Sequence, residues 1–371
     1  MANKTNVLAQ YDKQHKKYER FAKEVEHQLR SILEEEGIVC NAITSRVKER
    51  DSLDKKIDIK MDKYSDLTEI TDIAGIRVIT YYDNDVNRVA EIVEREFCVD
   101  KDNSIDKRKA LDPDKFGYCS VHYVVSMNET RLKLPECKAY AGLKCEIQIR
   151  TVLQHAWAEI EHDLGYKSET GVPRNIRRNF SRLAGLLELA DKEFQEIRDL
   201  LTEYRHDVTS MMEQDAPEVA DSELDVVVLE AILNTNPKLQ NLNQKISEIA
   251  GMEIRESELQ EKYVGSLHLL NSLLIQTTLQ LNQIIDQNIN LALYLAEKIL
   301  RDRYLAEPED SSLSRTIGIF YLCYAELLSK HPSIDEIIVY MRTNSIGDSD
   351  ESVYKFAESL LQYGHEFTSQ Q

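Results

Sequence analysis

The stretch LKCEIQIRTVLQHAWAEIEHDLGYK, residues 143–167, decides how the first half of the chain folds. Polar and apolar residues alternate over 143–150, which predicts a β-strand because successive side chains of a strand point to opposite faces. One face of this strand would carry Glu146, Gln148 and Arg150. A helical pattern follows over 152–164, so the strand should pass directly into a helix. The polar row suits a charged ligand, although an edge strand with one solvated face would alternate in the same way.

Two further segments predict strands that carry polar residues. Residues 76–82 are rich in β-branched and aromatic side chains, as a buried strand is, and Asp72, Gly75 and Arg77 lie at its start. A third strand is predicted over 119–127. One face of that strand and the residue before it would carry Tyr118, Ser120 and His122. The three strands would therefore direct polar side chains into one cleft.

Three short motifs occur in order: D-x-x-G-x-R at residues 72–77, G-Y-x-S-x-H at 117–122 and E-x-Q-I-R-T at 146–151. Together they resemble the synthetase domain of the RelA/SpoT homologues, which transfers pyrophosphate from ATP to the 3′-hydroxyl of a guanine nucleotide. The following helix has the family's Trp-Ala-x-x-Glu-His-x-x-x-Tyr-Lys pattern at 157–167. The resemblance covers roughly residues 40–200. It implies an α/β (α+β) nucleotidyltransferase-like domain with a mixed sheet flanked by helices.

The resemblance implies a catalytic centre made of Asp72, Glu146 and Arg77. Asp72 and Glu146 would bind Mg²⁺, which prefers hard oxygen ligands and bridges phosphate oxygens in phosphoryl transfer. Glu146 would either share the metal or accept the proton of the 3′-hydroxyl, and the sequence favours neither role.

The donor ATP would be held by basic side chains, because arginine offers phosphates a planar fork and lysine a compact charge. The residues similar to the family's basic motif are Arg46, Lys48, Lys55 and Lys56, joined by Arg77 from the strand. Lys55 and Lys56 are neighbours, and the sequence does not distinguish which of them binds ATP.

The acceptor, GTP or GDP, would contact the second and third motifs and the loop before them. These residues are Lys115, Tyr118, His122, Gln148 and Arg150, with the Tyr118 ring stacked on the base. Phe116 stands where many family members have asparagine, so the identity of the acceptor stays open. Toxic members of the family use an adenine nucleotide or the 3′ end of tRNA. A non-catalytic sensor or scaffold is a further alternative, against which the intact catalytic motifs speak.

The predicted helix after the third motif also carries His155, Glu159 and His162 on one face, at i, i+4 and i+7. A single E-x-x-H falls short of the paired carboxylate bridges of a di-iron bundle. The motifs of an alarmone hydrolase domain are missing from the sequence. We therefore interpret these residues as part of a structural helix and expect no hydrolase activity.

The composition indicates a cytoplasmic enzyme. Six cysteines without a C-x-x-C pair suit reduced thiols. The first residues lack the apolar core of a signal peptide, and no segment approaches about 18 uninterrupted apolar residues, so we expect no membrane contact. The net charge of −19 argues against generic nucleic-acid binding. A tRNA partner stays open because of two basic clusters, Lys13, Lys16, Lys17 and Arg20, and Arg174, Arg177, Arg178 and Arg182.

The charge distribution predicts two domains. Residues 215–371 hold 25 acidic and 11 basic side chains, a net of −14, whereas the remainder holds 40 and 35, a net of −5. All the motifs lie in the nearly balanced part. We predict a synthetase domain over 1–214 and a helical domain over 218–371, joined by the linker QDAPE at 214–218.

The second predicted domain reads as all-helical, notably over 263–285 and 290–303, with breaks at Pro308 and Pro332. It carries no catalytic motif. We expect a regulatory or interaction domain that binds a regulatory protein or mediates homo-oligomerisation.

Overall fold

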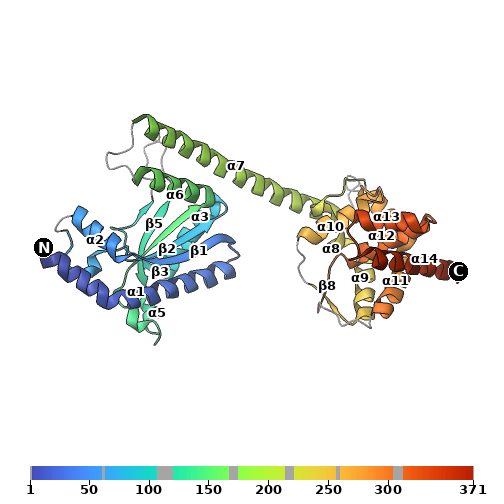
Figure 1. Ribbon diagram of the computed structural model, residues 1–371, viewed down its shortest axis with the longest axis horizontal. Helices are drawn as coiled ribbons and strands as arrows, with labels where there is room; N and C mark the ends of the chain where they lie inside the picture. Colours follow the sequence, from blue (N-terminus) through green and yellow to red (C-terminus); the bar gives the residue numbers. More distant parts are fainter. Residues whose placement is uncertain are drawn as a thin grey trace. The chain divides into compact units, whose positions relative to one another are not determined.

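The computed structural model describes residues 2–60, 63–106, 120–166, 174–213, 221–255, 260–303 and 312–370. Its contacts divide the chain into two units, Met1–Asp199 and Leu200–Gln371. The boundary falls within helix α7 (Arg174–Glu213) (Figure 1). The linker predicted at 214–218 lies outside the described residues.

The first unit is built on a mixed sheet (Figure 1). Its strands run in the order β1-β2-β6-β5-β3, with β4 paired to β5. The pair β2 and β6 is parallel, and the other pairs are antiparallel. The strand bounds are β1 (Cys40–Val47), β2 (Ala74–Thr80), β3 (Phe97–Val99), β4 (Ile105–Asp106), β5 (Val121–Met127) and β6 (Cys145–Thr151). The predicted mixed sheet flanked by helices is confirmed, while β1 is a strand that the sequence did not predict.

One face of this sheet is apolar and lies against α1 (Ala2–Glu35) and α3 (Asp83–Glu96). Fully buried side chains of β2 and β6 alternate along this face, namely Ile76, Val78, Ile147 and Ile149. Burying each contributes roughly 1.5–3 kcal/mol to stability. Ser45 of β1 donates a hydrogen bond to Glu26 of α1, and Tyr123 of β5 donates to Glu94 of α3. Both helices therefore cover the same face, which leaves the opposite face for polar side chains.

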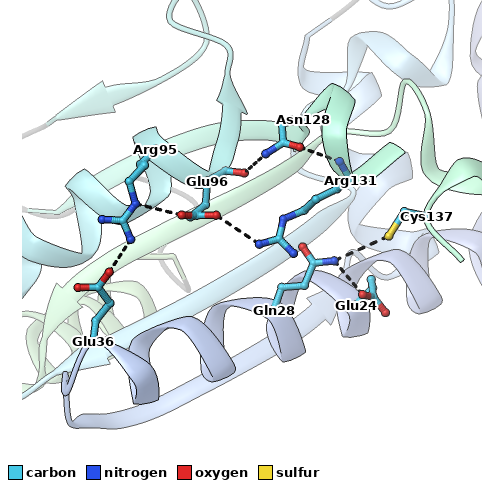
Figure 2. A network of polar contacts seen from close by, with 8 residues as sticks. All are labelled: Glu24, Gln28, Glu36, Arg95, Glu96, Asn128, Arg131 and Cys137. Atoms are coloured by element: carbon cyan, nitrogen blue, oxygen red, sulfur yellow. Dashed lines mark hydrogen bonds and ion pairs between the residues drawn. The ribbon is translucent and has the colours of Figure 1, made fainter. Parts of the chain in front are cut away.

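A polar network ties the ends of α1 and α3 together (Figure 2). Glu96, at the end of α3, accepts hydrogen bonds from Arg95 at 3.0 Å and from Arg131 at 3.3 Å. Arg95 also donates to Glu36, just after α1, at 2.7 Å, and Asn128 donates to the carbonyl of Glu96 at 2.8 Å. Exposed ion pairs contribute only about 0–1 kcal/mol each, so this network orients helix ends more than it stabilises them.

Further helices also belong to the first unit, and the first of them adds the buried Leu53 and Ile57 to the same core. They are α2 (Arg50–Ile59), α5 (Glu129–Leu132) and α6 (Val152–Tyr166), with the 3₁₀ turns η1 (Leu67–Glu69) and η2 (Lys138–Tyr140). Helix α6 begins at the residue that follows β6, as the sequence predicts.

The second unit has its own core of helices. They are α8 (Val226–Thr235), α9 (Pro237–Ala250), α10 (Gln260–Asn271), α11 (Thr278–Arg303), α12 (Ile317–Ser329), α13 (Ile334–Thr343) and α14 (Asp350–Ser369). Helix α12 is central, because Ile319, Leu322 and Tyr324 are at most 1% exposed. The prediction of a helical domain is confirmed, apart from the short parallel pair of β7 (Glu253–Ile254) and β8 (Ser312–Leu313).

The predicted helices over 263–285 and 290–303 were bounded wrongly, whereas the break at Pro332 is confirmed between α12 and α13 and Pro308 lies outside the described residues. The chain turns before Thr278, where Leu274 adopts a positive φ of 63°, and α11 then continues without interruption to Arg303. Thr277 and Gln280 form a reciprocal cap. The main-chain nitrogen of Gln280 donates to the Thr277 hydroxyl, and the main-chain nitrogen of Thr277 donates to the side-chain oxygen of Gln280. This T-x-x-Q signal explains the start of α11. Among the described helices, none has both the length and the apolarity that crossing a bilayer requires.

Candidate functional site

The strand register gathers the predicted site residues on the polar face of the sheet. Arg46 of β1, Gly75 of β2 and Glu146 of β6 lie side by side, because each pairs with the next. The neighbouring row contains Arg77, Gln148 and His122, again paired in register. The prediction that these strands share one polar face is therefore confirmed. Lys115 and Tyr118 lie outside the described residues.

Glu146 is the centre of a chain of hydrogen bonds. Its Oε1 lies 3.0 Å from His122 Nδ1, and its Oε2 accepts a hydrogen bond from Gln148 Nε2 at 2.9 Å. Gln148 in turn accepts a hydrogen bond from Arg150 Nη2 at 2.8 Å. Because Arg150 is only 3% exposed, its guanidinium supports Gln148 from within the protein. Both oxygens of Glu146 are thus held in fixed positions.

These contacts keep Glu146 ionised. Burial alone would raise the pKa of the carboxyl, but the hydrogen bonds of His122 and Gln148 and the positive charge of Lys56 outweigh burial and lower that pKa to about 2. A carboxylate with so low a pKa is a good ligand for a cation and a weak base at neutral pH.

Asp72 is clamped between two lysines. Lys56 Nζ, from α2, lies 2.7 Å from Asp72 Oδ1, and Lys48 Nζ, from the end of β1, lies 3.2 Å from Oδ2. The main-chain nitrogen of Lys48 donates to the carbonyl of Ile73 at 2.8 Å, which fixes the lysine beside the start of β2. Lys55 is exposed, because one step along a helix turns a side chain by about 100°. Of the two neighbouring lysines, it is therefore Lys56 that the structure places at the site.

Arg77 is held by the helix that follows β6. Its Nη1 lies 3.0 Å from Glu159 Oε1 of α6. The pKa of His155 on the same helix is lowered, first by burial and then by the positive charge of Arg150, with Glu159 opposing the effect. The sequence assigned Glu159 to a structural helix and missed its contact with Arg77. The available signal was its position two turns beyond a strand that pairs with the strand of Arg77.

Arg46 completes the basic surface around the carboxylates. Its side chain lies over Gly75, where a Cβ would be 3.7 Å from Arg46 Cγ. That is an ordinary contact, so no described protein group requires a glycine there. Basic side chains from β1, α2 and β2 thus surround two carboxylates, an arrangement that suits both phosphate oxygens and a divalent cation.

Two carboxylates of the site provide part of the ligand set that a divalent cation needs. The described residues contain no group of three or more His, Cys, Asp or Glu side chains arranged to hold an ion. Asp72 and Glu146 supply hard carboxylate oxygens, and Lys56, which contacts Asp72, also acts electrostatically on Glu146. A positive charge is therefore already accommodated near both carboxylates. Magnesium commonly binds through one or two carboxylates, with waters and substrate phosphates as its other ligands, so this donor set fits it.

Comparisons with known proteins agree on one family. The family model described as "Region found in RelA / SpoT proteins" matches residues 45–171. The GTP pyrophosphokinase YjbM of Bacillus subtilis (strain 168) is 31% identical over 162 residues, which cover 42% of this chain and 71% of that protein. The GTP pyrophosphokinase YwaC of the same organism is 30% identical over 162 residues, with the same two shares. The crystal structure of the small alarmone synthetase 1 from Bacillus subtilis bound to its product pppGpp is 26% identical. The structural alignment covers 53% of this chain and 99% of the chain in that crystal structure, with a TM-score of 0.44.

Proposed function

The chain belongs to the RelA/SpoT family, and we propose that it is a GTP pyrophosphokinase that moves a pyrophosphoryl group from ATP to the 3′-hydroxyl of GTP or GDP, producing (p)ppGpp. The observation that carries this proposal is the polar face of the sheet, where Asp72 and Glu146 lie among Lys48, Lys56 and Arg77. Pyrophosphoryl transfer requires such a combination of cations, metal-binding oxygens and a positioned acceptor.

Asp72 and Glu146 would hold the metal, which we propose to be Mg²⁺. When bound by these carboxylates, the metal would supply positive charge that offsets the charge developing on the donor phosphates. The low pKa of Glu146 supports a ligand role over a general-base role, since a base works best with a pKa near the working pH. His122 and Gln148 would keep both Glu146 oxygens aimed toward the site.

The donor ATP would be bound by Arg46, Lys48, Lys56 and Arg77. Each lies on the polar face or at its edge, and the two lysines that pair with Asp72 would bind phosphate oxygens placed beside it. Arg77, aligned by Glu159, presents a planar fork to the phosphate that is transferred. We favour Lys56 over the exposed Lys55 for this role.

The acceptor would be bound by Lys115, Tyr118, His122 and Gln148. His122 and Gln148 both contact Glu146, so a hydroxyl bound beside them would lie next to the carboxylates. Arg150 would act through Gln148, which it supports from a buried position. We propose the cytoplasm as the place of action, because both nucleotide substrates are found there.

A transfer assay tests this function. Purified protein is incubated with ATP labelled on its terminal phosphates, Mg²⁺ and one acceptor at a time: GTP, GDP, ATP or tRNA. Labelled product should form with GTP or GDP and disappear in Asp72→Asn. If labelled product formed only with tRNA, and the amount of product fell steeply as the salt concentration was raised, the acceptor would be tRNA and not a guanine nucleotide. If no acceptor received labelled phosphate, the remaining alternative would be a non-catalytic sensor or scaffold.

The helical second unit would serve regulation. It has its own core, and residues from 215 onward carry a net charge of −14, which suits a basic partner. A partner protein, or a second copy of the chain, would regulate turnover by binding one state of the enzyme better than another.

A further inference from the structure

A buried carboxyl lies behind the polar face of the sheet, outside the residues assigned to substrates. Asp191 of α7 is 4% exposed, and its Oδ2 accepts a hydrogen bond from the hydroxyl of Thr151 at 2.8 Å. Thr151 is fully buried at the end of β6. The bond joins two elements that are 40 residues apart in the sequence.

Thr151 is also the N-terminal cap of α6. Its hydroxyl oxygen accepts a hydrogen bond from the Gln154 main-chain nitrogen at 3.1 Å, and the Gln154 side chain accepts one from the Thr151 main-chain nitrogen at 3.0 Å. Because the hydroxyl gives its only proton to Asp191, its lone pairs are directed at the helix start. Asp191 therefore fixes the rotation of the group that caps α6.

Two site elements meet at Thr151. Strand β6 ends there and carries Glu146 and Gln148, while α6 starts there and carries Glu159, which holds Arg77 at 3.0 Å. A change in the direction of α6 would shift Glu159 and release Arg77. Misplacing a reacting or binding group by about 1 Å can cost about 100-fold in rate.

A different residue supplies the contact that docks α7 on the start of α3. Arg198, two turns further along α7, pairs with the buried Asp85 at 2.7 Å and lies over the Tyr82 ring at 4.4 Å. Burial raises the pKa of the Asp191 carboxyl to about 6. The Thr151 hydrogen bond opposes this rise, and the negative charge of Asp83 adds to it. At neutral pH the buried Asp191 carboxylate lowers the stability of the fold, and Arg198 already supplies a docking contact for α7. The presence of Asp191 therefore indicates a functional role.

We propose that Asp191 is a positioning residue for pyrophosphoryl transfer: it orients the Thr151 hydroxyl so that α6 starts in the direction that places Glu159 on Arg77. This proposal rests on the proposed function. Asp191 touches no substrate and acts through Thr151 alone.

Four variants separate positioning from general destabilisation. Asp191→Leu removes the acceptor and Thr151→Val removes the hydroxyl at nearly constant shape, while Asp191→Asn and Thr151→Ser keep the hydrogen bond. The first two should lower kcat/KM for ATP at least tenfold, because Arg77 both binds ATP and faces the phosphate that is transferred, and the last two should keep at least half of the wild-type kcat/KM. Asp199→Leu is the matched control, because Asp199 is exposed on the same helix and should leave kcat/KM unchanged.

Two further measurements complete the test. The double variant Asp191→Leu/Thr151→Val should be no slower than the slower single variant, because both changes break one path. Hydrogen exchange of the first turn of α6 should accelerate in Asp191→Leu and Thr151→Val but not in Asp191→Asn or Thr151→Ser. Wild-type kcat/KM and exchange in Asp191→Leu, or equal damage from leucine and asparagine, would overturn the proposal. If the wild type itself transfers no pyrophosphate, the proposed function fails, and the exchange data still decide whether Asp191 positions α6.

Discussion

Replacing Asp191 by asparagine should make the first unit more stable at neutral pH than at acid pH, relative to wild type. The pKa of Asp191 is about 6 in the folded protein, against an ordinary value of 3.8. A raised pKa means that the folded state holds the proton more tightly, so this stabilisation is complete below pH 3.8 and is lost as pH rises through 6. Because a tenfold change in proton affinity corresponds to about 1.4 kcal/mol, this difference in pKa amounts to about 3 kcal/mol, of which about 2 kcal/mol falls between pH 4 and pH 7.5.

Trp157 provides a probe for this unit alone. It is the one tryptophan of the chain and lies in α6, where its indole Nε1 donates to the carbonyl of Phe180 at 3.3 Å and its ring meets that of Phe180 edge-on. Urea unfolding followed by tryptophan fluorescence therefore reports the contact between α6 and α7. The unfolding free energy of Asp191→Asn minus that of wild type should rise by about 2 kcal/mol from pH 4 to pH 7.5.

The matched control is Asp199→Asn, which makes the same chemical change at an exposed position of α7. Its difference from wild type should vary much less with pH. A flat difference for Asp191→Asn, or one that falls with pH, would refute the reasoning that Asp191 is ionised at a cost inside the fold. Glu146 does not confuse the result, because it is present in both proteins and its own pH-dependent contribution cancels when wild type is subtracted from the variant.

Three further outcomes are expected. Asp72→Asn and Glu146→Gln should each lower transfer by at least about 1,000-fold, or about 4 kcal/mol, with Trp157 fluorescence unchanged, and near-wild-type turnover in either would exclude that residue from the metal site. Lys56→Ala should raise KM for ATP about tenfold and Lys55→Ala less than twofold, because of these two neighbours only Lys56 contacts Asp72, and equal effects would contradict the assignment. Ending the chain at residue 213, where α7 stops, should leave a folded enzyme whose kcat differs several-fold from that of the full chain, whereas identical kinetics would remove the regulatory role.

The strands that carry the motifs were predictable because their alternation is strong. β2 and β6 have a continuous apolar face, so the period of two is visible in the sequence. β1 was missed because it lies at the edge of the sheet and has one buried position among eight, Ile43. Its pairing with β2 provides the conformation, and such a long-range contact leaves little local pattern.

The candidate site was predictable where a residue belongs to a motif and not where it only supports one. Glu146 and Gln148 stand on a strand whose alternation fixes their common face. To choose between Lys55 and Lys56, one must know which side of α2 faces Asp72. The local sequence does not determine this orientation. Asp191 gave no signal, since an aspartate on an amphipathic helix is usually solvated, and only the packing of α7 makes it a buried partner of Thr151.

The low pKa of Glu146 has a consequence for the proton balance of the site. A carboxyl that must lose a proton before it binds a cation makes cation uptake acidify the solution and weaken as pH falls. At neutral pH, which is far above its pKa of about 2, Glu146 is already deprotonated. It would therefore release no proton when a divalent cation binds. Calorimetric titrations with Mg²⁺ in buffers of different ionisation enthalpy should therefore give the same heat, and any loss of activity in mild acid would originate in other groups, such as the phosphates of the nucleotides.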